Sequence, residues 1–219
     1  MQTVKRGILT VVSGFAGTGK GTVVKELCRR FPDEFVLSVS ATTRPPRPRE
    51  VDGREYFFKT AEQFEEMIRD GQLLEYANYV GNYYGTPRPY VEEQLKKGRN
   101  VILEIEIKGA YQIREIFPEA LLIFLMPPDA AELRRRLTGR NTESPEVITQ
   151  RLLKACIEAG ECRNYDYLLV NDRVDSCAEK LAQIVRMQSM RMERNRERLE
   201  SFAQELRTLL QQPQAGDAP

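Results

Sequence analysis

A glycine-rich loop near the N-terminus constrains this chain more than any other feature of its sequence. It follows an apolar run at residues 8–12 and precedes a segment with helical periodicity. In this context glycines let successive backbone N–H groups surround polyphosphate oxygens, and the following helix directs its positive end to the same place. The loop consists of Gly14, Phe15, Ala16, Gly17, Thr18, Gly19, Lys20, Gly21 and Thr22. Because Lys20 is placed to reach the β and γ phosphates, a nucleotide is the predicted ligand.

The residue after the lysine departs from the usual phosphate-binding loop. A serine or threonine commonly stands there and touches Mg²⁺, whereas this chain has Gly21 and offers a hydroxyl only at Thr22. We therefore expect Mg²⁺ to be held mainly through phosphates and water, which suits an ion that dehydrates reluctantly. The chain has no histidine and its cysteines lack Cys-x-x-Cys spacing, so a Cys/His zinc site is excluded and no metal-ligating residue is predicted.

Composition narrows the classes of protein to which the chain can belong. With 33 basic and 32 acidic residues the formal charge is +1, so no overall field draws the chain to nucleic acid or to a membrane. No apolar run reaches the length of about eighteen residues that a membrane span needs. We expect a cytoplasmic protein with reduced cysteines. A chain of 219 residues with 41% hydrophobic content fits one domain with inserted lobes better than two independent domains.

Apolar strands alternate with helical patterns along most of the chain, which is typical of a doubly wound α/β fold with a parallel sheet. Strands are predicted at residues 8–12, 101–105, 121–125 and 167–170, with a weaker candidate at 35–39. Helices are predicted at residues 22–31, 61–70, 90–97, 109–116, 129–137, 145–162 and from 176 onward.

Between about residues 40 and 84 the pattern changes to short pieces rich in Tyr and Arg, which predicts an inserted mixed-β lobe with small antiparallel strands at 54–58 and 79–84. The nucleotide-binding core is assigned to residues 4–38, 90–129 and 161–190, the inserted lobe to 39–89, and a short helical lid to 130–160. Residues 191–219 are assigned to a helical extension that ends in a disordered tail from residue 211.

A proline- and arginine-rich segment at residues 38–50 has two interpretations when it is taken alone. It is either a stiffened loop or a PxxP ligand for a partner domain. The motifs that follow it along the chain decide between these interpretations. In order, they are Asp52-Gly53-Arg54-Glu55-Tyr56-Phe57-Phe58, Leu74-Glu75-Tyr76-Ala77 and Gly81-Asn82-Tyr83-Tyr84-Gly85-Thr86-Pro87. Further motifs are residues 101–106, 136–143, 151–152, 165–167 and 170–172. In this order, behind a phosphate-binding loop, the motifs closely resemble the guanylate kinase family of bacterial type over roughly residues 4–190.

The resemblance implies that the γ-phosphoryl group of ATP is transferred to GMP, and to dGMP, giving ADP and GDP. The acceptor phosphate is already deprotonated, so the reaction needs no general base, and positive charge that screens and aligns the two anions suffices. By resemblance, Arg44, Arg47, Tyr56 and Tyr84 grip the GMP phosphate. Lys20, Arg140 and Arg151 converge on the transferred group, with Arg44 serving both sets. The resemblance adds Arg136 and Asn171 to the ATP site.

Recognition of guanine requires acceptors for N1–H and the 2-amino group and a donor for O6. By resemblance, Glu75 and Glu106 supply the acceptors, and the hydroxyls of Ser40 and Thr86 supply donors. Glu104 is counted with the GMP-binding residues and is placed toward the water shell of Mg²⁺. Adenine would leave Glu75 opposite a ring nitrogen without a proton, and sites built on such polar matching reject the wrong base by on the order of 10⁴.

Several positions depart from the family pattern. They are Phe15, Ala16, Gly21, Arg49, Glu104, Glu106, Lys108 and Asn141. Gly21 makes the loop similar to that of adenylate kinase, so another nucleoside monophosphate kinase is one alternative. A guanylate-kinase-like module that binds phosphopeptides without catalysis is the other, but such modules lack the loop lysine and lid arginines that this chain retains.

The C-terminal segment beyond residue 190 lies outside the motifs. Its apolar residues recur near helical spacing among many charges, which predicts either a solvated terminal helix or a subunit contact. The chain is accordingly expected to be a monomer or a homodimer, with ATP and GMP as its small-molecule partners.

Overall fold

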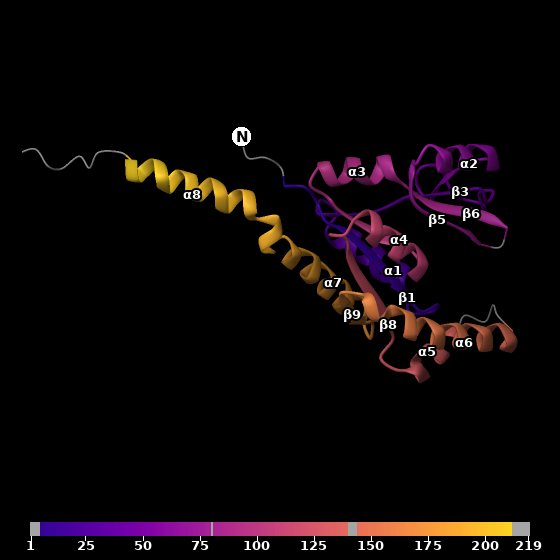
Figure 1. Cartoon of the computed structure of the whole chain (residues 1–219). Coiled ribbons are helices and arrows are strands. Elements are labelled where there is room, and N and C mark those ends of the chain that lie inside the picture. The colour runs from indigo at the N-terminus through magenta and orange to yellow at the C-terminus, as the bar shows by residue number, and fades with distance from the viewer. Residues whose placement is uncertain (1–4, 80, 140–143, 212–219) are drawn as a thin grey trace, which may run out of the picture.

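A five-stranded parallel sheet forms the centre of the computed structural model, which describes residues 5–79, 81–139 and 144–211 (Figure 1). The strand order is β2-β7-β1-β8-β9, and every neighbouring pair is parallel. The bounds are β1 Leu9–Gly14, β2 Phe35–Leu37, β7 Asn100–Glu104, β8 Leu121–Met126 and β9 Tyr167–Val170. The predicted α/β fold with a doubly wound parallel sheet is confirmed.

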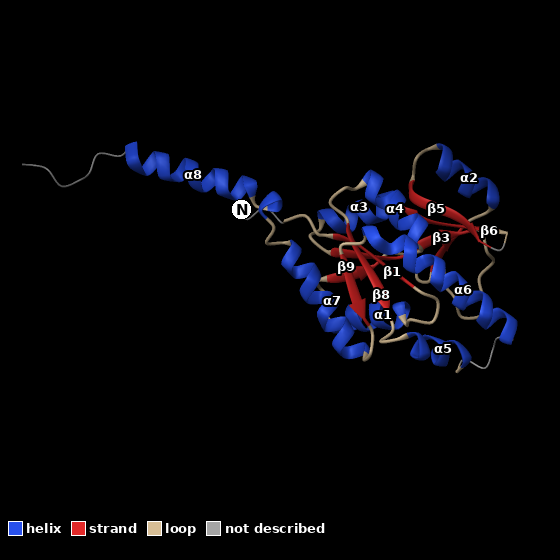
Figure 2. Ribbon diagram, turned by 60° about the horizontal axis from the view of Figure 1, so that its bottom comes forward, coloured by secondary structure: helices blue, strands red, loops and turns tan. Residues whose placement is uncertain are grey.

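Helices cover both faces of this sheet (Figure 2). Side chains of β1 alternate between two apolar clusters, since Val12 packs with α1 (Lys20–Arg30) and α7 (Val174–Gln188), whereas Val11 packs with α3 (Arg88–Lys96) and α4 (Ile107–Ile116). A central parallel strand that is buried on both faces reads as a continuous apolar run, which is why the sequence located it correctly.

A second, mixed sheet carries the inserted lobe, in the order β4-β3-β6-β5. Its strands are β3 Ser40–Thr42, β4 Tyr56–Phe58, β5 Leu73–Tyr79 and β6 Asn82–Pro87, with α2 (Ala61–Arg69) beside them. The sequence missed β3 and all of β5 except its last residue, because the predicted strand at 79–84 joined the end of β5 to the start of β6. The expected antiparallel pairing is wrong for β4, which runs parallel to β3. A register irregularity between Leu73 and Tyr76 interrupts the alternation of β5, so Leu73, Leu74 and Glu75 are all buried.

Two helices lie close to the phosphate-binding loop, namely α5 (Ala130–Thr138) and α6 (Pro145–Glu161). A separate apolar cluster joins them, in which Leu133, Leu137 and Ala155 pack with Phe15 and Ala16 of the loop. The lid assigned from the sequence is therefore attached to the loop through side-chain packing.

The C-terminal segment is not one continuous helix. After α7 the chain forms a short 3₁₀ turn, η2 (Met192–Arg194), and then α8 (Arg196–Gln211), which projects away from the body (Figures 1 and 2). The break has a cause in packing, because Arg194 donates to the carbonyl oxygens of Arg6 and Gly7. Residues 212–219, where a disordered tail was expected, lie outside the described residues. Within the described ranges no helix has both the length and the apolar character that a membrane crossing requires.

Candidate active site

The phosphate-binding loop joins β1 to α1, and glycines give it its shape. Gly17 and Gly19 adopt φ values of 85° and 84°, a left-handed conformation that residues with a Cβ rarely adopt. Asn171 Nδ2 donates to the carbonyl oxygen of Thr18 at 2.7 Å, and Arg136 Nη1 donates to the same oxygen at 3.2 Å. Arg136 also reaches the Asn171 carbonyl oxygen at 2.9 Å. Arg136 and Asn171, two residues predicted for the ATP site, thus support the loop by hydrogen bonds to its backbone.

Lys20, the first residue of α1, folds back over this loop. Its Nζ donates to the carbonyl oxygens of Gly14 at 2.6 Å and Phe15 at 3.1 Å. Burial lowers the pKa of Lys20, while the nearby carboxylates of Glu104 and Glu158 oppose that shift. An ammonium group that is held this way is drawn to polyphosphate, because phosphate oxygens replace neutral carbonyls as acceptors.

Gly21 faces the carboxylate of Glu104 across a narrow gap. A Cβ built at Gly21 would lie 3.2 Å from Glu104 Oε2 and 3.4 Å from Oε1. Glu104 thus fills the space beside the position where the loop hydroxyl is missing. It opens onto the cavity described next, yet the surrounding protein displaces enough water to raise the pKa of its carboxyl, against the attraction of Lys20.

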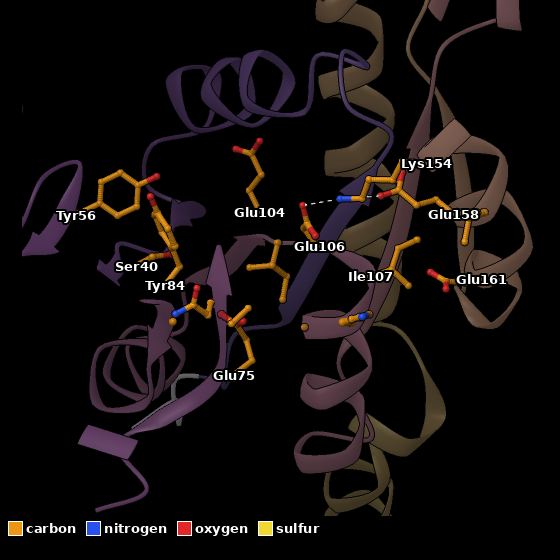
Figure 3. Close-up of a pocket in the computed structure, with 17 residues that line it drawn as sticks. Ser40, Tyr56, Glu75, Tyr84, Glu104, Glu106, Ile107, Lys154, Glu158 and Glu161 are labelled. Carbon is orange, nitrogen blue, oxygen red and sulfur yellow. Dashed lines mark hydrogen bonds and ion pairs between the residues drawn. The ribbon is translucent and has the colours of Figure 1, made fainter. Parts of the chain in front are cut away.

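A cavity of about 680 Å³ lies between the inserted lobe, the end of β7 and α6. Most of the predicted GMP-binding residues line it, and Figure 3 shows them arranged around it: Ser40, Tyr56, Glu75, Tyr84, Glu104 and Glu106. Thr86 lines a smaller recess of about 100 Å³ that shares Ser40, Tyr56 and Glu104 with the main cavity.

Glu75 is the most enclosed acidic group of this cavity, with 8% of the residue exposed. The Thr86 hydroxyl donates to Glu75 Oε1 at 2.6 Å. Burial raises the pKa of Glu75, and the bond from Thr86 opposes that shift. The residue predicted to accept from N1–H and the residue predicted to donate to O6 are therefore paired with each other.

Arg44 is engaged with a residue that sequence reasoning missed. Its Nη2 lies 2.9 Å from Glu50 Oε2, and the backbone N–H of Arg47 donates to the same oxygen at 2.7 Å. The Arg44 guanidinium also lies over the Tyr56 ring, 5.3 Å from its centroid, and Tyr56 meets Tyr84 edge to face at 6.0 Å. Arg44, Tyr56 and Tyr84 thus form one cluster, with exposed Arg47 at its margin.

Helix α6, which belongs to the lid assigned from the sequence, contributes cavity residues that differ from those predicted. The described residues of α6 that line the cavity are Lys154, Ile157, Glu158 and Glu161. Arg151 lies on the same helix and is partly buried, and Arg140 lies outside the described residues. The spacing of Lys154 and Glu158, one helical turn apart on the predicted lid helix, is the signal that could have found this pair.

Comparisons with known proteins point to one family. The family model described as guanylate kinase matches residues 6–212. A guanylate kinase of Streptococcus agalactiae is 52% identical over 190 residues, which cover 87% of this chain and 91% of that protein. One from Streptococcus pneumoniae is 55% identical over 180 residues, 82% and 86% of the two chains. The crystal structure of a guanylate kinase from Anaplasma phagocytophilum is similar with a TM-score of 0.70 and 34% identity, covering 90% of this chain and 95% of that one.

Proposed function

The chain belongs to the guanylate kinase family, and we propose that it transfers the γ-phosphoryl group of ATP to GMP, and to dGMP, giving ADP and the nucleoside diphosphate. One observation carries this proposal in the geometry. A phosphate-binding loop with its lysine lies beside a cavity of about 680 Å³ that the buried residue Glu75 lines. This arrangement suits a nucleotide donor on one side and a purine acceptor on the other.

Positively charged side chains bind the phosphates and stabilise the transition state of the transfer. Lys20 leaves the carbonyl oxygens of Gly14 and Phe15 for the β and γ phosphates, and Arg140 and Arg151 approach the transferred group from the lid. Arg44 and Arg47 grip the acceptor phosphate, with hydroxyls from Tyr56 and Tyr84. Planar guanidinium groups suit this task because they bind phosphate oxygens in pairs and follow the charge of a loose transition state.

Selection of guanine follows from the acidic groups of the cavity. Ionised Glu75 accepts from N1–H and the 2-amino group, Glu106 adds a second acceptor, and Ser40 and Thr86 donate to O6. The Thr86 hydroxyl turns from Glu75 to the base when GMP binds. Adenine, which has no proton on N1, leaves the buried Glu75 without donors, and that is costly.

Mg²⁺ fits the site as a companion of ATP. The described residues include no cluster of three or more acidic, histidine or cysteine side chains that could hold a metal ion by itself, and Gly21 offers no ligand. Glu104, whose carboxylate lies above Gly21, is the residue that would face the water shell of the ion. When bound, Mg²⁺ neutralises phosphate charge. The expected cytoplasmic location remains a prediction.

An ADP-release assay tests this function directly. Purified protein with MgATP is supplied in turn with GMP, dGMP, AMP, UMP and CMP. We expect turnover with GMP and dGMP to exceed turnover with the other acceptors by at least about a hundredfold. Equal efficiency with AMP would favour another nucleoside monophosphate kinase. If no nucleotide is phosphorylated while a phosphopeptide binds the cavity, the chain is a binding module.

A further inference from the structure

An ion pair joins the acceptor side of the cavity to α6. Lys154 Nζ lies 3.0 Å from Glu106 Oε1 and 3.5 Å from Glu158 Oε1, as Figure 3 shows for the first contact. Glu106 directly precedes α4, whereas Lys154 lies near the middle of α6. The contact with Glu106 therefore bridges two elements that are remote in sequence, and the contact with Glu158 stays within one helix.

Glu106 needs an external contact if it is to hold one position. Its side chain is 68% exposed, and although it stands at the start of α4 it makes no capping hydrogen bond there. A glutamate in such a setting samples many rotamers, and ordering it costs conformational entropy. The ion pair engages Oε1, and an ionised carboxylate has acceptor capacity for further donors.

We propose that Lys154 is a positioning residue for base selection, which holds the Glu106 carboxylate at the cavity wall so that it accepts from the 2-amino group of guanine. The inference rests on the proposed function. Lys154 does not touch the reacting atoms in this account. It acts through Glu106, so its loss is expected to weaken discrimination between purines rather than phosphoryl transfer.

The position of α6 itself does not depend on Lys154. Ala155 and Leu152 pack against Leu133 and Leu137 on α5. At the other end of α6, the Tyr111 hydroxyl donates to the Glu161 carbonyl oxygen. Removing the Lys154 ammonium group therefore leaves the helix anchored at both sides of the residue, and a change in base selection can be assigned to Glu106.

The test compares Lys154→Met with the wild type through the ratio of kcat/KM for GMP to kcat/KM for IMP, which lacks the 2-amino group. Because the pair is exposed, we expect this ratio to fall about two- to fivefold. KM for GMP should rise while kcat and KM for ATP stay unchanged. Lys154→Arg should retain most of the ratio. Lys97→Met removes an exposed lysine that pairs with Glu93 outside the cavity lining and should leave the ratio unchanged.

A double-mutant cycle separates positioning from a structural role. In a Glu106→Ala background, Lys154→Met should have no further effect on the ratio. An unchanged ratio in the single variant, an equal loss in the Glu106→Ala background, or tighter binding of GMP would each overturn the proposal. Wild-type protein that fails to phosphorylate GMP would instead overturn the proposed function. Calorimetric binding of GMP and IMP to the same variants still tests the role of Lys154 in that case.

Discussion

The two sides of the active site are built in different ways. On the phosphate side, backbone conformation gives the loop its shape, because two of its glycines are left-handed. Side chains of Asn171 and Arg136 hold the loop by donating to the Thr18 carbonyl oxygen. On the acceptor side, side chains pair with one another across elements, as Thr86 does with Glu75, Arg44 with Glu50 and Lys154 with Glu106.

The two constructions imply different modes of ligand binding. The loop offers backbone N–H groups whose positions are fixed before a nucleotide arrives, so binding requires little rearrangement. On the acceptor side, we expect Thr86 and Arg44 to exchange Glu75 and Glu50 for GMP, whereas the pair of Lys154 with Glu106 is expected to persist. Removing a charged group at the loop is therefore expected to lower kcat, because that group acts in the transition state. Removing a charged group in the lobe is expected to weaken the selection of guanine.

The largest effect is expected from removing the one charged side chain of the loop. Lys20→Ala should lower kcat by at least about 10², because the ammonium group acts mainly in the transition state. Circular dichroism and the melting temperature should show that the fold survives. Lys25→Ala, an exposed lysine on the same helix, serves as the control and should keep near-wild-type turnover. Near-native turnover by well-folded Lys20→Ala protein would exclude the catalytic role of this residue.

A loss of kcat/KM of comparable size, specific to guanine, is expected when Glu75 of the inserted lobe is replaced. Glu75→Gln preserves the shape of the side chain but replaces one acceptor with a donor, so kcat/KM for GMP should fall by roughly 10² through KM. Glu62→Gln, an exposed change on α2 in the same lobe, should have no such effect. Steady-state kinetics with GMP and AMP measure both. A loss of equal size for both bases would argue against a role of Glu75 in recognising guanine.

Proton binding at Glu75 provides a smaller perturbation of the same group. Burial raises the pKa of Glu75, and only the ionised form accepts from guanine, so kcat/KM for GMP should decline by up to about tenfold per pH unit below that pKa. The unliganded folded protein binds more protons than the unfolded chain between the ordinary and the raised pKa. Its free energy of unfolding should therefore decrease as pH rises through that window.

The pH dependence is measured as kcat/KM for GMP and as urea unfolding without ligand, each for wild type and Glu75→Gln. The variant should lose the contribution of this residue to both curves. Identical curves for the two proteins would assign the acid limb to another group, such as Glu104, whose pKa burial also raises.

A modest gain in stability is expected from replacing Arg49, which lies near Arg44 in the sequence. Arg49, one of the positions that depart from the family pattern, adopts φ of 77°, a conformation that costs roughly 1–2 kcal/mol for a residue with a Cβ. Arg49→Gly should raise the melting temperature by about 1–3 °C after the entropic cost of glycine is deducted. Arg49→Ala retains the Cβ and should give no such gain. Calorimetry that shows equal shifts for the two variants would assign the effect to charge.

The smallest effect is expected from removing α8. Its larger apolar side chains are exposed, namely Leu199, Phe202, Leu206, Leu209 and Leu210, and the helix projects from the body (Figure 1). Truncation after Asn195 preserves the contacts of Arg194 with the N-terminal segment and should change kcat/KM less than twofold. Light scattering should give the same number of subunits for both forms. A drop in subunit number would identify α8 as a subunit contact.

The parts of the fold that were predicted correctly are those that short stretches of sequence encode. The buried strands of the parallel sheet are continuous apolar runs, the loop follows a strand and opens a helix, and the order of motifs indicated the family. Short polar strands gave weaker signals. β3 and all of β5 except its last residue were missed because pairing with β6, rather than local propensity, makes them strands, and a register irregularity interrupts the alternation of β5.

The phosphate-binding loop, the parallel sheet and the types of residue that the reaction needs could be predicted from local sequence, since glycine conformation, apolar periodicity and charge are properties of short segments. Which charges meet depends on the folded arrangement. Glu50 holds Arg44, Glu104 lies over Gly21, and Lys154 reaches Glu106 across 48 positions of the chain. Such contacts depend on how sheet, lobe and lid pack together, and long-range packing leaves no local signal in the sequence.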